Sequence, residues 1–253
     1  MNVLIVFAHH EPQSFNHALL ARSVAELQAQ GHRVQVSDLY AMGFSPVAGE
    51  ADFTQRRFPN MLQYDREQKF ASEHQAFAPD IQAEIDKLLW CDLLILQFPL
   101  WWFSVPAILK GWIDRVFVNG VAYGKGQRMD TGGLKGRKAM LTVSTGCYEN
   151  MVAPDGLLGD LHVNLWHLHA GTLAYAGLTV LPPFLSWSIH YLDAPGRAAY
   201  LDAYALRMRE LPTVQPLFFH PTSDFGADWR LKPEVAPATV AHRRPGSSQA
   251  VLP

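Results

Sequence analysis

Cysteine is scarce in this sequence: Cys91 and Cys147 are the only two among 253 residues. They lie far apart and form no CxxC or CxxxC pair, so the chain has too few thiolates for a disulfide framework or a thiolate zinc site. Disulfides are typical of oxidising compartments, and a chain without a disulfide framework fits a reducing one. We therefore expect a cytoplasmic protein.

Charge of one sign and long apolar stretches are also missing. The sequence has 21 Lys and Arg against 23 Asp and Glu. This near balance gives no electrostatic reason to expect a nucleic acid or an anionic membrane as partner. No stretch approaches the roughly 18 uninterrupted apolar residues of a membrane-spanning helix, so we expect no integral membrane segment. The first apolar run covers residues 3–8 and stops at His9, which indicates a strand and not a signal peptide.

Short apolar runs alternate with helical patterns along the chain. Five strand candidates, four of them continuously apolar, cover residues 3–8, 32–39, 93–98, 139–143 and 178–181. Strands that are apolar at successive positions are typical of a parallel sheet covered on both faces. Apolar side chains recur at helical spacing in residues 15–30, 81–89 and 106–118. This alternation predicts an α/β protein with a doubly wound sheet, which binds ligands at the carboxyl ends of its strands.

Two segments interrupt the alternation. Residues 40–80 are too long for a simple loop, and we expect a partly helical excursion with a role of its own. After Leu211 the sequence becomes rich in proline and aperiodic. We therefore predict a domain of residues 1–211 and a C-terminal extension, residues 212–253, that packs on this domain or on a second subunit.

Residues suited to ligand binding follow three of the predicted strands. The first junction, FAHHEPQSFNHALL, places short polar donors at a helix N-terminus, where phosphates bind; an ordinary loop with Ser14 as helix cap is the simpler alternative. The second, FPLWWFSVP, stops at Pro99 and offers three aromatic rings to a planar ligand, although such groups more often pack in a core. The third, TVSTGCYENM, offers hydroxyl groups and bare backbone at Ser144, Thr145 and Gly146.

A set of motifs runs in order from residue 2 to about residue 225: FAHHEPQSFN, SDLYAMGFSPV, LLILQFPLWWFSVPAILKGWIDRVF, VAYG, TVSTG, GDLHVNLWHLHAGTLAYAGLTVLPP and DAPGRAAYLDAY. Together they resemble the NAD(P)H:quinone oxidoreductases of the DT-diaphorase type. The resemblance implies a flavodoxin-like fold with a five-stranded parallel sheet of strand order 2-1-3-4-5. It also implies FAD rather than FMN as cofactor, NAD(P)H as co-substrate, and a homodimer with the active site at its interface.

The resemblance assigns roles to residues by their position in these motifs. The first loop resembles the segment that contacts the flavin pyrophosphate and ribityl chain, the second the segment that holds the isoalloxazine ring, and the third the loop at its pyrimidine edge. The cofactor residues implied in this way are His10, Ser14, Phe15, Asn16, Ala18, Pro99, Leu100, Trp101, Trp102, Phe103, Thr145, Gly146 and Cys147, with Gln63 and Arg197 at the adenine half. Tyr123 and Tyr175 resemble aromatic walls that the second subunit contributes to the substrate pocket, which Trp102 and Phe103 would also shape.

The sequence departs from this family beside the flavin. The family's tyrosine and histidine that face the N1 and O2 edge of the ring fall on Val152 and Leu158, which would line the pocket without an acid–base pair. Such a pair neutralises the charge that develops when hydride reaches flavin N5. We expect Lys125, at the place of a second pocket tyrosine, and Tyr148 to be candidate substitutes through a positive charge and a hydroxyl.

Three histidines near one another in sequence, His162, His167 and His169, suggest a metal site. Side chains two residues apart point to opposite sides of a strand and diverge on a helix. We therefore expect core or interface histidines here and no metal.

The resemblance implies an NAD(P)H dehydrogenase that passes hydride through FAD to a quinone or another small aromatic acceptor by a ping-pong mechanism. Two alternatives remain open. The first is a reductase of the same fold that acts on an azo compound, a nitroaromatic or another electrophile. The second is a regulatory flavin-binding subunit of a membrane transporter.

Overall fold

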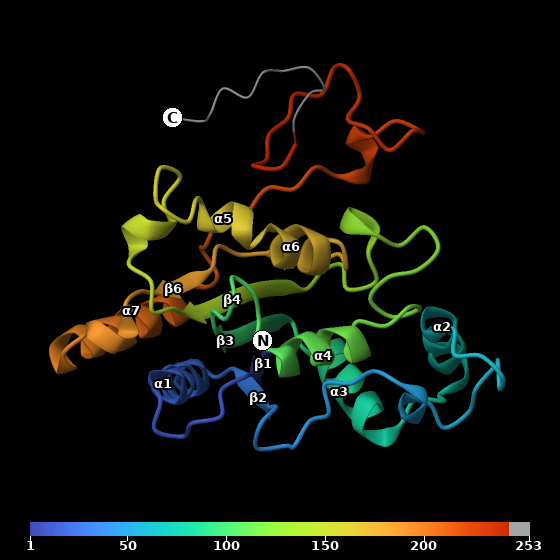
Figure 1. Ribbon diagram of the computed structural model, residues 1–253, viewed down its shortest axis with the longest axis horizontal. Helices are drawn as coiled ribbons and strands as arrows, with labels where there is room; N and C mark the ends of the chain where they lie inside the picture. Colours follow the sequence, from blue (N-terminus) through green and yellow to red (C-terminus); the bar gives the residue numbers. More distant parts are fainter. Residues whose placement is uncertain (243–253) are drawn as a thin grey trace.

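A six-stranded parallel sheet runs through the middle of this computed structural model, which describes residues 1–242 (Figure 1). The strands are β1 (Asn2–Phe7), β2 (Arg33–Asp38), β3 (Leu93–Pro99), β4 (Lys138–Ser144), β5 (Thr179–Val180) and β6 (Phe184–Ser186). Their order is β2-β1-β3-β4-β5, and β6 also pairs with β4. The predicted flavodoxin-like order is confirmed, although the last strand is split in two because Pro182 and Pro183 cannot donate to a ladder.

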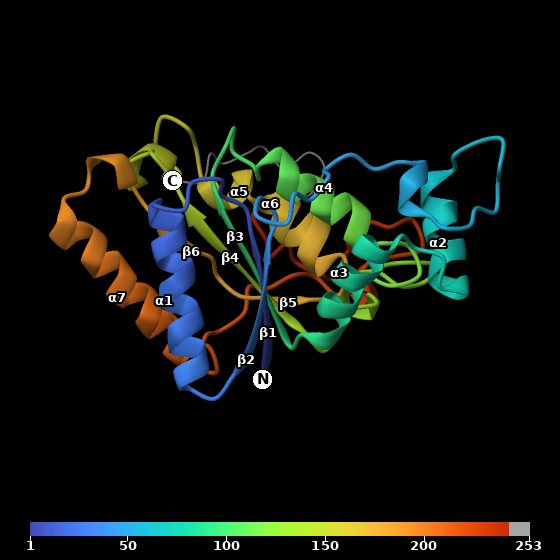
Figure 2. The ribbon, with the colours of Figure 1, turned by 90° about the horizontal axis from the view of Figure 1, so that it is seen from below.

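Helices cover both faces of the sheet, as Figure 2 shows from below. α1 (Phe15–Ala29) and α7 (Ala194–Glu210) pack on one face, and α3 (Pro79–Trp90) and α4 (Ala107–Val116) on the other. Alternate residues of one strand serve the two cores: Val3 faces α1 and α7, whereas Leu4 faces α3 and α4. β3 is buried at every position, which explains its continuous apolar run.

The helix predicted for residues 15–30 has the expected ends. The Ser14 side chain caps α1 by accepting a hydrogen bond from the His17 amide. Gly31 follows the helix with φ of 77°, a left-handed conformation that glycine adopts without a steric penalty. The Ser14 cap and Gly31 therefore set where α1 begins and where it ends.

The excursion between β2 and α3 is partly helical, as predicted, with η1 (Glu50–Asp52) and α2 (Tyr64–His74). A buried ion pair ties it to α4: the Arg115 Nη2 atom lies 2.7 Å from Asp52 Oδ1. The same arginine donates to the Ser45 carbonyl at 2.6 Å, and the Tyr64 hydroxyl donates to Asp52 Oδ2 at 2.5 Å. These side chains, together with backbone hydrogen bonds such as that from the Thr54 amide to the Ala76 carbonyl at 2.8 Å, therefore fix the excursion.

Shorter helical segments complete the described chain. They are η2 (Met129–Thr131), η3 (Glu149–Val152), α5 (Leu161–Asn164), α6 (Trp166–Leu168), the π-helical η4 (His169–Ala174), η5 (Ile189–Tyr191) and η6 (Thr222–Asp224). Within residues 1–242, no helix has both the length and the apolar character needed to cross a membrane.

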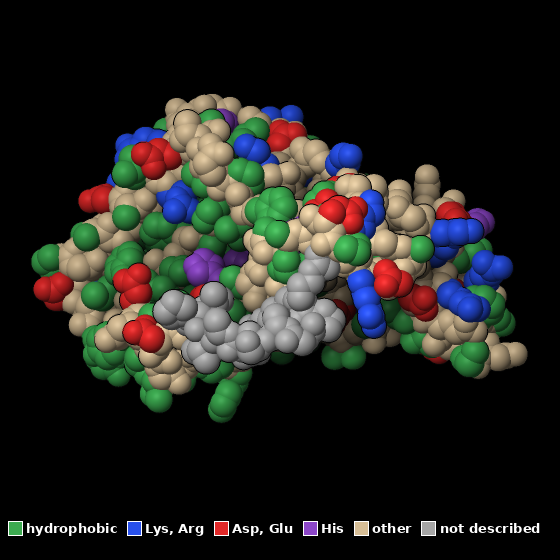
Figure 3. All heavy atoms as spheres, turned by 90° about the horizontal axis from the view of Figure 1, so that it is seen from above, with side chains coloured by type: hydrophobic (Ala, Val, Ile, Leu, Met, Phe, Trp, Pro, Cys, Tyr) green, Lys and Arg blue, Asp and Glu red, His purple; other side chains and the backbone are tan. Residues whose placement is uncertain are grey.

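The chain after α7 lies against the segment that precedes β5. The Leu217 amide donates to the Val180 carbonyl at 2.8 Å, and the rings of Phe219 and Trp166 lie 5.7 Å apart. Figure 3 views the molecule from above, where acidic and basic side chains are interspersed over the surface. Residues 243–253 of the predicted extension lie outside the described residues.

Candidate functional site

A cavity of about 500 Å³ lies at the carboxyl ends of β1, β3 and β4. We call it the edge cavity. Its lining includes nine of the predicted cofactor residues: His10, Ser14, Phe15, Asn16, Pro99, Leu100, Trp101, Thr145 and Gly146. The other lining residues are His9, Glu11, Ser144, Ile189 and His190. Three loops that are distant in sequence thus meet in one hollow.

Asn16, in the first turn of α1, presents an unpaired acceptor in this region. Its side chain is 5% exposed, and its Nδ2 donates to Ser144 Oγ at 2.8 Å. The side chain of Gln97 on β3 holds the Asn16 carbonyl by donating to it at 2.6 Å. Asn16 Oδ1 has no hydrogen-bond partner among the described residues. A buried acceptor without a donor is costly, and a ligand hydroxyl in the edge cavity would satisfy it.

The second wall is a two-residue turn that connects β3 to α4. Trp101 and Ser104 exchange two backbone hydrogen bonds at 3.1 and 3.0 Å, with Trp102 and Phe103 at φ of 51° and 58° between them. Positive φ at both central residues defines a type I′ turn, which favours Asn-Gly. Bulky residues there cost of order 1–3 kcal/mol each, and such strain is typical of functional sites. The turn leaves the Trp102 side chain 96% exposed beside the cavity.

The third wall consists of two segments bonded to each other, residues 145–147 after β4 and residues 188–191 after β6. The Ile189 amide donates to the Thr145 carbonyl at 3.2 Å. The Ser188 amide and hydroxyl both donate to the Cys147 carbonyl, at 3.0 and 3.2 Å. A Cβ atom added to Gly146 would lie 3.5 Å from His190 Cδ2, so the imidazole lies directly over this glycine.

The β1–α1 loop brings histidine rings to the helix N-terminus. The rings of His9 and His10 stack with centroids 4.9 Å apart. Burial, reinforced by the neighbouring His10, lowers the pKa of His9, so His9 is mainly neutral at pH 7. Its Nδ1 accepts from the Glu11 amide at 3.1 Å, which places the remaining proton on Nε2. This proton and the positive end of the α1 dipole suit an anionic group such as a phosphate.

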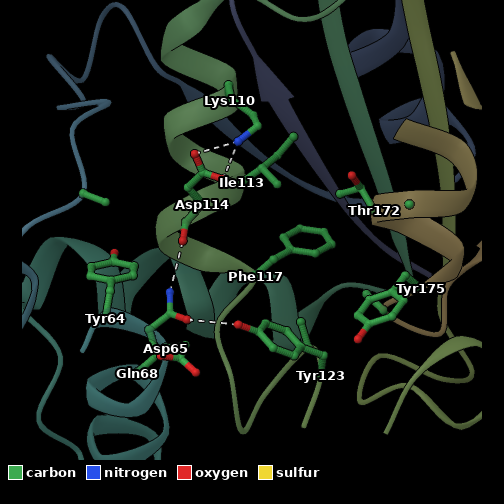
Figure 4. A pocket seen from close by; sticks show the side chains of 14 residues that line it. Tyr64, Asp65, Gln68, Lys110, Ile113, Asp114, Phe117, Tyr123, Thr172 and Tyr175 are labelled. Atoms are coloured by element: carbon green, nitrogen blue, oxygen red, sulfur yellow. Dashed lines mark hydrogen bonds and ion pairs between the residues drawn. The ribbon is translucent and has the colours of Figure 1, made fainter. Parts of the chain in front are cut away.

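A second cavity of about 470 Å³ lies between α2, α4 and η4, away from the strand ends (Figure 4). We call it the tyrosine cavity, because Tyr64, Tyr123 and Tyr175 line it. The rings of Tyr123 and Tyr175 have centroids 6.2 Å apart. Burial raises the pKa of Tyr123, as does the nearby Asp65, so the Tyr123 hydroxyl keeps its proton at neutral pH.

Gln68 of α2 joins the elements around the tyrosine cavity and is 3% exposed. Its Nε2 donates to the Asp114 carbonyl at 3.1 Å (Figure 4). Its Oε1 accepts from the Asn119 amide at 3.3 Å. The Tyr123 hydroxyl donates to the same oxygen at 3.5 Å, a weak contact. This one amide therefore orders the floor of the cavity.

Comparisons with known proteins find the same fold and the same family over most of the chain. The family model described as "Flavodoxin-like fold" matches residues 1–211. NAD(P)H dehydrogenase [quinone] 1 of Cavia porcellus is 40% identical over 92% of this chain and 86% of its own length. Ribosyldihydronicotinamide dehydrogenase [quinone] of Mus musculus is 42% identical over 87% and 95%. The chain belongs to the NAD(P)H dehydrogenase (quinone) family.

A solved structure from Klebsiella pneumoniae, whose assignment as a quinone reductase is itself provisional, extends this agreement to three dimensions. It superposes with a TM-score of 0.90 at 37% identity and covers 94% of this chain and 96% of its own. The likeness therefore includes most of the segment after α7, which the family model does not match.

The structure places the other predicted site residues of this family member outside the lining of the edge cavity. Trp102, Phe103 and Cys147 lie next to lining residues, and Ala18 lies one turn into α1. Gln63 is the N-cap of α2, and Arg197 lies exposed on α7, where it donates to the Leu192 carbonyl. Tyr123 and Tyr175 line the tyrosine cavity.

Val152 and Leu158, which depart from the family pattern, lie in different surroundings from the candidate substitutes Lys125 and Tyr148. Val152 is 4% exposed, and both Val152 and Leu158 pack in the core formed on the α3 and α4 face of the sheet. Lys125 is exposed on the loop after Tyr123. The Tyr148 ring is half-exposed and stacks on Tyr191, with centroids 5.6 Å apart. Neither substitute belongs to the lining of the edge cavity within the described chain.

The three histidines of the α5–η4 segment do not converge. His167 Nε2 lies 3.0 Å from Ser104 Oγ, whereas His169 is 2% exposed in the core. Burial lowers the pKa of His169 to about 4, and its Nε2 has no partner among residues 1–242, so it is a buried but unsatisfied histidine. In this part of the chain, no group of three or more His, Cys, Asp or Glu side chains is arranged to hold a metal ion.

Sequence reasoning missed His9 and His190 of the edge cavity. His9 directly precedes the predicted His10, so its position after β1 was a usable signal. His190 had no such signal, because it follows β6 and reaches the cavity only through the hydrogen bonds between residues 145–147 and 188–191.

Proposed function

We propose that this protein transfers hydride from NAD(P)H through a bound flavin to a quinone. The observation that carries the proposal is the edge cavity, formed at the strand ends of a flavodoxin-like sheet. Relatives of 40% and 42% identity are named as quinone dehydrogenases. Nicotinamide and quinone would use one slot in turn, which is a ping-pong mechanism.

The residues of the edge cavity fit a flavin. The unpaired Asn16 Oδ1 suits a ribityl hydroxyl, the first turn of α1 suits the phosphates, and the backbone of Thr145 and Gly146 suits the polar edge of the ring. We favour FAD over FMN, because Gln63 and Arg197 are available for an adenine half beyond the cavity. The flavin supplies the hydride chemistry, and the protein binds it, orients it and excludes water.

The proposed unit is a cytoplasmic homodimer in which each tyrosine cavity faces the partner. Tyr123 and Tyr175 would then form the far wall of the partner's slot, opposite Trp102 and Phe103. The type I′ turn supports this role, because a Trp102 side chain 96% exposed to solvent in one chain is available to a ligand or a second subunit. Residues 1–211 would carry the chemistry, with residues 212–253 as an extension.

An anaerobic stopped-flow experiment tests the proposal. The purified protein is loaded with FAD or, separately, with FMN, mixed with NADH or NADPH, and then mixed with a small quinone. We expect rapid flavin bleaching and rapid reoxidation, with parallel double-reciprocal plots in the steady state. A bound flavin that neither nicotinamide reduces would contradict the proposal.

The same assay separates the alternative acceptors. Reoxidation by an azo dye or a nitroaromatic that is faster than by any quinone would identify a different reductase of this fold. Analytical ultracentrifugation of the holoprotein tests the dimer, and a monomer at micromolar concentration would contradict the shared slot.

A further inference from the structure

The titratable side chains that line the edge cavity fall into two groups. His9, His10 and Glu11 belong to the β1–α1 loop, at the helix N-terminus that suits phosphate groups. His190 belongs to η5 and lies on the opposite wall, over the backbone of Gly146. It is the one titratable lining residue, within the described chain, beside the Thr145 and Gly146 backbone.

The main chain holds His190 in this position. Its neighbour Ile189 donates to the Thr145 carbonyl at 3.2 Å, and Tyr191 donates to the Ser188 carbonyl at 2.8 Å. Ser188 has φ of 54° and is tied twice to the Cys147 carbonyl. The aromatic stack of Tyr191 on Tyr148 closes the outer side of the same turn. A turn fixed at this many points presents its histidine without the entropy cost of ordering a mobile loop.

Three other side chains after β4, those of Val152, Leu158 and Tyr148, are unsuited to stabilising a charge here. Val152 and Leu158 offer no polar atom and pack in the core. Tyr148 uses its ring against Tyr191 at the rim. The imidazole of His190 is therefore the titratable side chain that lines this wall.

We propose that His190 is a catalytic residue that donates a hydrogen bond to the pyrimidine edge of the bound flavin and stabilises the negative charge formed there on reduction. The inference rests on the proposed function. Preorganised donors aimed at developing charge are among the largest contributions to enzyme catalysis, and charge near flavin N1 tunes the cofactor. His190 would do this work from η5 rather than from the β4 loop.

The proton and electron count of the reaction is unchanged by this role. NAD(P)H, a proton and a quinone yield NAD(P)⁺ and a hydroquinone, so two electrons and two protons reach the acceptor. One proton travels with the electrons as hydride, and the other comes from solvent or from the imidazole, which solvent then reprotonates. His190 forms no covalent bond at any point.

The test compares His190→Gln with His32→Gln in the flavin-loaded protein. His32 lies before β2 at the opposite edge of the sheet, so the control makes the same change away from the cavity. We expect His190→Gln to lower the rate of flavin reduction by about 100-fold, the lower end of the range typical of general acid–base effects. The flavin midpoint potential should become more negative, with the flavin dissociation constant changed less than threefold. His190→Lys, which supplies a hydrogen-bond donor at the same position, should recover part of the potential shift.

Other outcomes overturn the proposal. An unchanged midpoint potential in His190→Gln excludes the role, and so does weakened flavin binding with an unchanged reduction rate, which would indicate a contact to the ribityl or adenine part. Lys125→Met and Tyr148→Phe identify the donor if either of them shifts the potential instead. The potential is measured by chemical reduction, so it tests His190 even if the protein does not oxidise NAD(P)H.

Discussion

The edge cavity and the tyrosine cavity are built by different means. Main-chain contacts between strand ends dominate the first, such as the Leu100 amide on the Ser144 carbonyl at 2.8 Å and the Ile189 amide on the Thr145 carbonyl. Side chains from separate helices build the second, with Gln68 and the buried Arg115–Asp52 pair as its supports. One substitution should therefore damage the tyrosine cavity more than the edge cavity.

The largest expected effect is on the ion pair beneath the tyrosine cavity. Asp52→Asn removes the nearest charge opposite Arg115, and these two residues are 2% and 4% exposed. Removing one partner of a buried ion pair costs about 3–5 kcal/mol of unfolding free energy, and the exposed Asp80, 3.6 Å from Arg115, should bring the loss to the lower end of this range. Urea denaturation measures the loss. The control Lys110→Met breaks the exposed Lys110–Asp114 pair at 2.6 Å and should cost less than about 1 kcal/mol. Equal effects would show that the buried Arg115–Asp52 pair is not a special support of the tyrosine cavity.

His169, in η4 beside the tyrosine cavity, should make the free energy of unfolding depend on pH. Burial lowers its pKa from 6.5 to about 4, so below pH 6.5 the unfolded chain binds a proton that the folded chain does not. Its contribution is present above pH 6.5 and is lost as the pH falls towards 4. Between pH 7 and 4.5 this amounts to about 2–3 kcal/mol.

Urea unfolding of the wild type and His169→Leu at both pH values isolates this contribution from the other titrating groups. The variant should lose less stability on acidification than the wild type. Parallel pH profiles of the two proteins would show that His169 is not the group responsible.

The edge cavity is tested by flavin affinity. Asn16→Leu removes the unpaired Oδ1 and the hydrogen bond to Ser144, and it should raise the flavin dissociation constant about 10- to 100-fold, which is about 1.4–2.7 kcal/mol. Equilibrium titration by flavin fluorescence measures it. Tyr123→Phe in the tyrosine cavity should change this constant less than threefold. A larger change in Tyr123→Phe would mean that the two cavities do not have separate tasks.

The smallest expected effect concerns the strained turn beside the edge cavity. Trp102→Gly places glycine at φ of 51° and should stabilise the flavin-free protein by about 1 kcal/mol, while lowering quinone turnover more than flavin retention. Gln75→Gly, at φ of 54° after α2, should give a similar stabilisation with turnover intact. Loss of stability in Trp102→Gly would show that the ring packs on the protein itself, contrary to its exposure.

The two cavities also differ in how far the sequence predicts them. The edge cavity follows from strand ends, and nine of its lining residues were predicted, because parallel strands bring their carboxyl ends to one edge. The tyrosine cavity joins residues 48 to 176 through the excursion, and only Tyr123 and Tyr175 of its lining were singled out, by resemblance alone. Asp52 and Gln68 gave no sequence signal, since their buried partners come from α4 and from the loop that follows it.

Hydrophobic periodicity and turn residues determined the strands, the helices and the parallel character of the sheet, because burial on both faces of a sheet requires apolar residues at successive positions. The strand order was implied by the family resemblance. Tertiary structure alone decided that Val152 enters the core, that Leu158 packs against it, and that His190 reaches the edge cavity. Each of these outcomes depends on contacts between segments far apart in the chain. Local propensity does not encode such contacts, and packing and hydrogen bonds select them only when the whole domain closes.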